Sequence, residues 1–412
     1  MSIKNIAAAT VALVAMNCAT SSAADKPDRH LVEARRILRQ VPLIDGHNDV
    51  PWQYRKRATN NLSALDLEHD TAGLTPTMHT DIPRLRAGQI GGQFWSVYVS
   101  VKPSGAEAVQ ATIEQIDVVH RMCSRYPETF ELALTADDVE RIHRKGLIAS
   151  LIGMEGGHSI NNSLGTLRMM YRLGARYMTL THTKNTDWAD AAGDVAKHHG
   201  LTPFGEDVVR EMNRLGMLVD LSHVTDDVMR DALRVTKAPV IFSHSSARAI
   251  CDHVRNVPDD VLRLTATNGG VVMVCFLPSY VNEVDRKDGE AAKTERDRLE
   301  AIHGDDMRQL NKGMAEWRKK YPDPNAATLS DVADHIDHIR KIAGVDHIGV
   351  GGDFDGFTGA VKDLEDVSKY PDLFAELLRR GYSQDDIKKI AGLNVLRALR
   401  GAEWVARELP TK

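Results

Sequence analysis

Six stretches of this chain end in side chains that bind metal ions or move protons. The stretch LIDGHNDVPW is an apolar run that ends in His47 and Asp49. Side chains two residues apart in an extended backbone point to the same face, so this pair can hold one ion. The other five stretches end in Glu155, His182, His223, His244 and Asp353.

The types of these residues indicate a catalytic metal site. His223 and His244 close two consecutive apolar runs and can hold a second ion. Imidazole nitrogens with carboxylates and no thiolate suit Zn²⁺ in a catalytic site, although Mn²⁺ and Co²⁺ accept the same ligands. Glu155 has two carboxylate oxygens that can bridge two ions. Gly156 and Gly157, which follow it, let ions and substrate approach the backbone.

A pair of such ions predicts hydrolysis. Two ions about 3.5–4 Å apart lower the pKa of a shared water and polarise a carbonyl, so that a metal-bridging hydroxide can attack an amide. The chain contains no Walker A motif, Rossmann glycine fingerprint, HExxH or GxSxG. Kinases, dehydrogenases, thermolysin-type peptidases and serine hydrolases therefore lack their motifs. We expect metal-assisted hydrolysis of an amide bond.

Eight short apolar runs bounded by Gly or Pro alternate with segments of helical spacing, which predicts parallel strands covered by helices. Eight such units favour an α/β fold of the (β/α)8 TIM type as a single domain over residues 25–412, closed by a helix at 383–400. The runs are 41–47, 93–99, 147–155, 176–182, 217–223, 239–244, 270–277 and 347–353. The helical segments include 106–121, 164–173, 203–215, 226–235, 258–266 and 329–342.

An open doubly wound sheet is the main alternative, and the ends of the runs argue against it. All strand C-termini of a barrel meet at one rim, whereas an open sheet would place the ionisable residues along an edge. A single histidine at a strand end is more often a hydrogen-bonded structural residue than a ligand. Four histidines and several carboxylates that each close a separate strand are better explained by convergence on one pocket.

These residues lie in blocks that resemble the membrane dipeptidase (renal dipeptidase) family of zinc peptidases, within the amidohydrolase-like barrels. The blocks follow the family order along nearly the whole chain. They are LIDGHNDVPW, LRAGQIGGQFWSVYV, LIGMEGGHSI, TLTHTKNTDWAD, LVDLSHV, APVIFSHSSA, RNVPDDVLRL and GGDFDG.

The resemblance implies a (β/α)8 barrel that binds two zinc ions and hydrolyses dipeptides, often with a D-residue at the C-terminal position. It implies that His47 and Asp49 hold the first zinc and that Glu155 bridges the two ions. His223 and His244 would hold the second zinc.

The resemblance also implies three residues that act on the substrate. His182 would contact the substrate and steady the oxyanion. Arg255 would bind the C-terminal carboxylate of the dipeptide, a task that suits its bidentate fork. Asp353 would exchange the proton between water and the leaving amine, or hold the free amino group.

Each of these three residues has an alternative interpretation. Arg255 could neutralise the first turn of the following helix, and His182 could orient a metal ligand instead of touching the substrate. Asp355 is the rival of Asp353, although Asp353 ends the apolar run. We interpret the remaining histidines of the blocks and loops as loop or surface residues: His158, His198 and His199.

Composition limits the partners of the protein. The 412 residues are 42% hydrophobic and 26% charged, as in an ordinary globular protein. The net charge of -5 and pI near 6.4 provide no basic field for phosphates, so we expect no nucleic-acid partner. After the N-terminal stretch, no segment is apolar for 18 residues, and we expect no transmembrane segment. The expected partner is a small dipeptide substrate, and a homodimer remains open.

Residues 1–24 have the order of a secretory signal peptide, with Lys4, an apolar stretch and small residues before Asp25. We therefore expect an exported protein, periplasmic or secreted. The alternatives are a buried first helix or a lipid anchor at Cys18, where the preceding residues match a lipoprotein cleavage site poorly. At most one disulfide can form among the three later cysteines, Cys123, Cys251 and Cys275.

Two regions differ from a plain barrel of this family. Residues 282–327 form a charged insertion, with 293–319 expected to be helical. A solvated surface excursion is favoured over a lid or a subunit contact, because charge runs are usually solvated. Thr186-Asp187-Trp188 replaces the proline-containing form expected there, which affects the local loop. We expect no lipid-anchor signal at the C-terminus, so the word membrane in the family name is not transferred.

Two other functions fit parts of this pattern. A hydrolase with the same site could act on β-lactams or N-acyl amino acids, and a strong loss of dipeptide cleavage in Arg255→Ala would favour the dipeptidase instead. A non-catalytic metal- or peptide-binding barrel fits less well, because all the expected ligands and the proton-transferring aspartate are present.

Overall fold

A computed structural model describes residues 28–304 and 306–409 of the chain. Within these residues a parallel sheet runs in the order β2-β1-β9-β8-β7-β6-β5-β4, and pairing of β2 with β4 closes it into an eight-stranded barrel. The strands are β1 (Leu43–Asn48), β2 (Ile90–Ser96), β4 (Ile148–Glu155), β5 (Ala175–Thr179), β6 (Leu218–Asp220), β7 (Ile241–Phe242), β8 (Val271–Val274) and β9 (Ile348–Val350). The predicted (β/α)8 barrel is confirmed.

A ninth strand, β3 (Phe130–Leu132), lies outside the ring and was not expected from the sequence. It pairs in parallel with residues 148–150 of β4, whereas β5 pairs with residues 152–155 of the same strand. The long strand β4 therefore has room for two partners along one edge, and β3 occupies the part that β5 does not reach.

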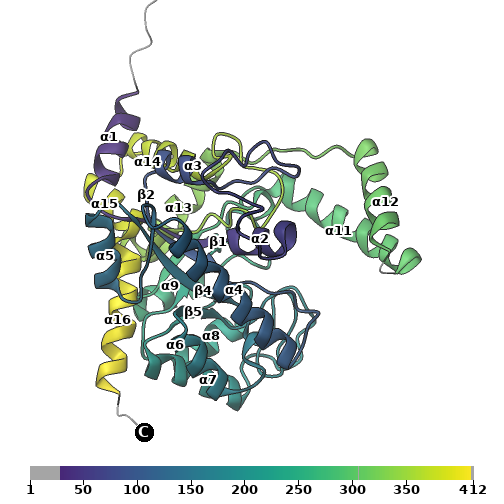
Figure 1. Cartoon of the computed structure of the whole chain (residues 1–412), viewed down its shortest axis with the longest axis horizontal. Helices are drawn as coiled ribbons and strands as arrows, with labels where there is room; N and C mark the ends of the chain where they lie inside the picture. Colours follow the sequence, from purple (N-terminus) through teal and green to yellow (C-terminus); the bar gives the residue numbers. More distant parts are fainter. Residues whose placement is uncertain (1–27, 305, 410–412) are drawn as a thin grey trace, which may run out of the picture.

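Helices pack around the barrel, and Figure 1 shows α16 lying along one side of it. Between the strands run α2 (Val50–Ala58), α3 (Ile82–Ala87), α4 (Ala106–Arg125), α5 (Ala136–Arg144), α6 (Leu164–Arg172), α7 (Pro203–Leu215), α8 (Asp226–Val235), α9 (Asp259–Asn268), α10 (Pro278–Val281), α11 (Glu283–His303), α12 (Met307–Lys320) and α13 (Leu329–Ala343). Before β1 lies α1 (Arg29–Leu38), and after β9 lie α14 (Tyr370–Arg379), α15 (Gln384–Lys388) and α16 (Asn394–Glu408).

The predicted elements are present, but their bounds differ. Most strands end two or three residues before the predicted apolar runs do. The last residues of these runs belong to the loops at the mouth of the barrel. The expected closing helix is divided into α15, a π-helical turn (Lys389–Leu393) and α16. An unexpected helix, α1, packs against α14 with its buried residues Ala34, Ile37 and Leu38.

The charged insertion forms two helices, α11 and α12, which project from the barrel as an arm (Figure 1). The single helix expected over 293–319 is interrupted at Gly304, which follows α11 with φ 59°. Leu299 and Leu310 are buried, and Arg318 forms an ion pair with Asp288 at 2.7 Å. Most of the remaining surface of the arm is exposed.

Three further expectations concern export and covalent links. The signal peptide expected at 1–24, with Cys18, lies outside the described residues and stays a prediction. Among the helices of residues 28–304 and 306–409, none is both long enough and apolar enough to cross a membrane. The three cysteines in these parts of the chain are free thiols: Cys123, Cys251 and Cys275.

Candidate metal centre

The barrel brings the ionisable residues from the ends of the runs to one mouth. His47 lies within β1, Glu155 is the last residue of β4, and Asp49 immediately precedes α2. The remaining four lie two or three residues beyond β5, β6, β7 and β9, in the loops at the C-terminal ends of these strands: His182, His223, His244 and Asp353.

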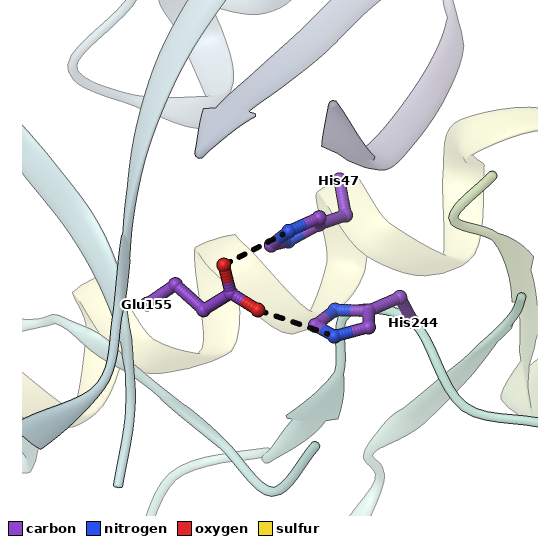
Figure 2. A group of neighbouring side chains, drawn as sticks. All are labelled: His47, Glu155 and His244. Carbon is purple, nitrogen blue, oxygen red and sulfur yellow. Dashed lines mark ion pairs between the residues drawn. The ribbon is translucent and has the colours of Figure 1, made fainter. Parts of the chain in front are cut away.

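Glu155 occupies the centre of this cluster, and Figure 2 shows His47 and His244 on either side of its carboxylate. Its Oε2 lies 3.4 Å from His47 Nε2, and its Oε1 lies 3.5 Å from His244 Nε2. His223 Nε2 and His182 Nε2 are 3.0 and 3.6 Å from the same Oε1. One buried carboxylate therefore faces imidazoles from four different strands, an arrangement that suits a bridging ligand.

The donor atoms fit metal ions. Three groups within the described residues have donor atoms within 4.8 Å of one another, and they contain imidazole and carboxylate but no thiolate. Within the described residues, buried His47 Nε2 has no hydrogen-bond partner, and it lies 3.3 Å from Asp49 Oδ2. Imidazole and carboxylate donors of this kind are typical of catalytic metal sites rather than of closed thiolate sites. The groups are His47 with Glu155 and His244, Glu155 with His182 and His223, and His47 with Asp49 and Asp353.

The electrostatics keep most of these donors in metal-binding form. Burial disfavours the charge on Glu155, but His47 and His182 outweigh it and hold the pKa of Glu155 well below its usual value. Burial also lowers the pKa of His182 to about 4 and holds the pKa values of His223 and His244 well below normal. At neutral pH these three neutral imidazoles face an ionised carboxylate, and His223 Nε2 and His244 Nε2 lie 2.9 Å from each other.

His47 differs from the other histidines. Burial would lower its pKa, yet the charges of Tyr177, Glu155 and Asp49 hold the pKa of His47 well above its usual value. The acids around His47 therefore favour a positive charge at Nε2. A metal cation satisfies the same demand.

The backbone at the mouth is held in an uncommon conformation. His223 and Asp353 have φ of 70° and 59°, in the left-handed region that non-glycine residues seldom occupy. Such residues cluster at functional sites, where the surrounding structure fixes them. Gly156, with φ 109°, leaves space for the ring of His158, since a Cβ there would lie 2.6 Å from the ring atoms. His158 is half-buried next to the site, and its Nε2 has no hydrogen-bond partner.

Arg255 forms no ion pair with the acids in the first turn of the helix that follows it, which argues against this alternative interpretation. The two acids in the first turn of α9 bond elsewhere, Asp259 to His338 at 2.7 Å and Asp260 to Arg230 at 2.9 Å. Arg255 is 5% exposed, and its Nε and Nη2 have no hydrogen-bond partner in the described residues. A buried guanidinium with unused donors is costly unless an anion reaches it.

Asp353 and its rival Asp355 point to different surroundings. Asp353 lies in the donor group with His47 and lines the cavity. Asp355 accepts a hydrogen bond from the backbone N–H of His79 at 2.8 Å and does not line that cavity. The geometry therefore places Asp353, and not Asp355, at the centre.

A cavity of about 310 Å³ opens above Glu155, which is enough space for a small peptide. Besides the expected residues, the cavity is lined by five side chains that the sequence analysis did not single out: Trp52, Tyr98, Thr183, Leu277 and Tyr280. Trp52 and Tyr98 form an edge-to-face pair with centroids 4.8 Å apart, and Tyr98 lies within the second predicted run, just beyond the end of β2. An aromatic residue just beyond a barrel strand was the available signal.

Comparisons with known proteins identify the family of the chain. The family model described as "Membrane dipeptidase (Peptidase family M19)" matches residues 31–412. The chain belongs to this family. Solved structures with the same fold include the probable dipeptidase PvdM from Pseudomonas aeruginosa, 23% identical with a TM-score of 0.79 over 92% of this chain and 100% of that chain.

Two further solved structures are similar. A dipeptidase AC, described as a metallo peptidase, is 25% identical with a TM-score of 0.69, over 88% of this chain and 98% of that chain. A metallo peptidase from Rhodobacter sphaeroides, liganded with a phosphinate mimic of the dipeptide L-Ala-D-Ala, is 24% identical with a TM-score of 0.69, over 88% and 99% of the two chains. Family membership supports a metallo-dipeptidase, a metal-dependent hydrolase that acts on dipeptides.

Proposed function

We propose that the protein is a dinuclear zinc dipeptidase. His47 and Asp49 would hold one ion, His223 and His244 the other, and Glu155 both. When bound, two such ions lower the pKa of a shared water, so that hydroxide can attack, and polarise the scissile carbonyl. The observation that carries this proposal is the single carboxylate of Glu155, whose two oxygens face histidines from opposite sides of the mouth.

The charges of the cavity fit a zwitterionic dipeptide. Asp49 and Asp353 lie on the side of His47, where they can attract an amino group. The charge of Arg255 acts on His182, His223 and His244, and its Nη2, which has no hydrogen-bond partner among the described residues, would donate to a carboxylate. Charge-assisted hydrogen bonds to both the amino group and the carboxylate of the substrate require these two groups to be close together. A substrate with one peptide bond therefore suits the site better than a long peptide.

Asp353 suits the transfer of the proton to the leaving amine. Burial, reinforced by the charges of Asp49 and Glu155, raises the pKa of Asp353 well above its usual value. A carboxyl group with a raised pKa can carry a proton at neutral pH and release it during the reaction. His182, whose pKa of about 4 leaves it neutral, would donate a hydrogen bond to the oxyanion.

The stereochemical preference is a further part of the proposal. The Rhodobacter sphaeroides relative binds a mimic of L-Ala-D-Ala. The lining of the cavity in this chain includes Leu277 and Tyr280, and the apolar side chain of Leu277 and the ring of Tyr280 would accept a substrate side chain of either configuration. We therefore expect cleavage of dipeptides with either an L- or a D-residue at the C-terminal position.

A substrate panel tests the proposal. The purified full chain is assayed against L,L and L,D dipeptides, their N-acetylated and C-terminally amidated forms, a β-lactam and a tripeptide, before and after chelation. We expect zinc-dependent cleavage of free dipeptides and much weaker cleavage of the blocked forms. Preferred cleavage of the acetylated forms or of the β-lactam would replace the dipeptidase by the related amidohydrolase, and metal-loaded protein inert to the whole panel would indicate a binding protein.

A further inference from the structure

Asp220 is a buried carboxylate that the proposed reaction does not use. It ends β6, is 0% exposed, and has only neutral hydrogen-bond donors among its observed partners. Its Oδ1 accepts from the backbone N–H groups of Ser222 at 3.1 Å and Ser243 at 2.8 Å. Its Oδ2 accepts from the hydroxyls of Thr179 and Ser243, the latter at 2.7 Å. An ionised side chain is expensive to bury this way, so its position needs an explanation.

The donor and acceptor roles in these hydrogen bonds determine which nitrogen of the His244 ring carries the hydrogen. An ionised carboxylate only accepts hydrogen bonds, so the hydroxyl hydrogen of Ser243 points to Asp220. Ser243 Oγ then has its lone pairs free for His244 Nδ1, which lies 2.8 Å away. The hydrogen of the neutral His244 ring must therefore sit on Nδ1. Its Nε2 keeps a lone pair, and this atom lies 3.5 Å from Glu155 Oε1.

We propose that Asp220 is a positioning residue for the metal ion held by His223, His244 and Glu155. Acting through Ser243, it fixes the tautomer of His244 and aims Nε2 at the ion. Hydrogen-bonded partners of metal-binding histidines commonly have this role. The inference rests on the proposed metal centre and adds to it a residue that touches neither metal nor substrate.

The other ion has a different support. Tyr177 OH lies 2.8 Å from His47 Nδ1 and 3.3 Å from Gly46 O. If the tyrosine donates to the carbonyl, its oxygen accepts from His47 Nδ1 and leaves Nε2 free, with no carboxylate in the chain of bonds. The absence of a side chain at Gly153 gives the Tyr177 ring room to cross the barrel. Loss of Asp220 should therefore affect one ion and not the other.

The variant Asp220→Asn reverses the chain of bonds without changing its shape. The two backbone N–H groups cannot turn, so they retain the amide oxygen, and the amide NH₂ faces the two hydroxyls. Ser243 then accepts from the amide, and we expect its hydroxyl to donate to His244 Nδ1 at 2.8 Å in preference to Ser222 Oγ at 3.5 Å. This moves the ring hydrogen to Nε2, the atom that the metal needs.

Metal content is the readout, measured on the full chain loaded with excess Zn²⁺ and passed through a desalting column. We expect two ions per wild-type chain and one per Asp220→Asn chain, with one site about 10–100-fold weaker in competition with a chelator. Thr179→Val is the matched control, because it removes a donor from the same carboxylate but leaves the Ser243 bond. It should retain both ions.

The outcomes separate the two proposals. A folded Asp220→Asn protein, judged by circular dichroism, that keeps two ions with wild-type chelator resistance overturns the role of Asp220 and leaves the dipeptidase standing. Wild-type protein that binds no second ion overturns the dinuclear site itself. If Asp220→Asn does not fold, Ser243→Ala decides, because it breaks the link to His244 directly. The proposal then requires weaker binding of one ion, and unchanged binding of both refutes it.

Discussion

The metal centre has an acidic end and a cationic end, although both are built from loops at the same barrel rim. At the acidic end, Asp49 and Asp353 lie with His47 and line the cavity. At the cationic end, burial and the charge of Arg255 lower the pKa values of His223 and His244, while the Arg255 side chain does not itself line the cavity. This contrast shows that the charges around the centre are unevenly distributed. We expect the proposed dipeptide substrate to bind with its amino group toward the acidic end.

The largest effect should come from the residue that joins the two ends. Glu155→Gln removes the carboxylate shared by both ions, and we expect kcat/KM to fall by more than about 10³-fold, since each ion loses a ligand. Metal content per chain should fall with it. Gln adds no volume, so circular dichroism should stay unchanged. Near-normal activity in Glu155→Gln would contradict the proposed metal centre.

The next largest effect is expected at the acidic end, from Asp353→Asn. We expect kcat to fall by about 10²–10⁴-fold with little change in KM, because the variant keeps the shape but cannot pass a proton to the amine. Asp355→Asn, in the same loop but away from the cavity, is the matched control and should keep kcat within about twofold. Equal losses in both variants would indicate damage to the loop instead of a lost proton donor.

At the cationic end, Arg255→Ala removes the proposed binding partner of the substrate carboxylate. A charge-assisted hydrogen bond contributes about 1.5–3 kcal/mol, so KM for a free dipeptide should rise by about 10–100-fold. KM for the same dipeptide with a C-terminal amide should hardly change. Arg230→Ala, which removes an exposed arginine paired with Asp260, should leave both KM values unaltered. A KM increase that is the same for acid and amide would contradict a role in binding the carboxylate.

A smaller effect concerns the support of the cationic end. His335 is 0% exposed, its Nδ1 accepts from the backbone N–H of Ala247, and its Nε2 lies 3.1 Å from the carbonyl of Val281. Ala247 belongs to the loop that carries Arg255, and Val281 is the last residue of α10, which contains Tyr280. Burial lowers the pKa of His335 to about 4, so only the neutral ring is well accommodated.

The free energy of unfolding should therefore depend on pH. Between about pH 6.5 and 4 the unfolded chain binds a proton that folded His335 does not, so stability falls as pH falls, by up to about 1.4 kcal/mol per pH unit from this group. Gln does not titrate, so the free energy of unfolding of His335→Gln should fall less as the pH falls. Urea unfolding of the chelated wild-type and His335→Gln proteins at pH 7.5 and 5 measures the difference. An equal loss of unfolding free energy between these pH values in the two proteins would contradict the prediction.

The sequence predicted the barrel and the centre because both depend on a repeated pattern. Each apolar run that ends in an ionisable residue marks a strand end, and a closed parallel sheet brings those ends together whatever the details between them. The sequence did not predict β3, whose three residues follow a long helix and form no clear apolar run. It also missed the break at Gly304, where two charged helices replace one.

The supporting residues were harder to find because their partners are distant in the chain. Tyr177 reads as one more apolar strand residue, and its bond to His47 joins positions 130 residues apart. Asp220 had a usable signal, an acid inside the buried run LVDLSHV, since such an acid must find hydrogen-bond donors. Which donors it finds depends on the neighbouring strands, and only the three-dimensional structure shows that.

The central claim is that two metal ions at one mouth make this protein a dipeptidase. Stepwise addition of Zn²⁺ to metal-free protein, with bound metal and hydrolysis of a small dipeptide followed in the same samples, tests it most directly. We predict negligible activity without metal and a plateau at two bound ions per chain. Full activity in thoroughly metal-free protein, or bound zinc without any hydrolysis, would contradict the account.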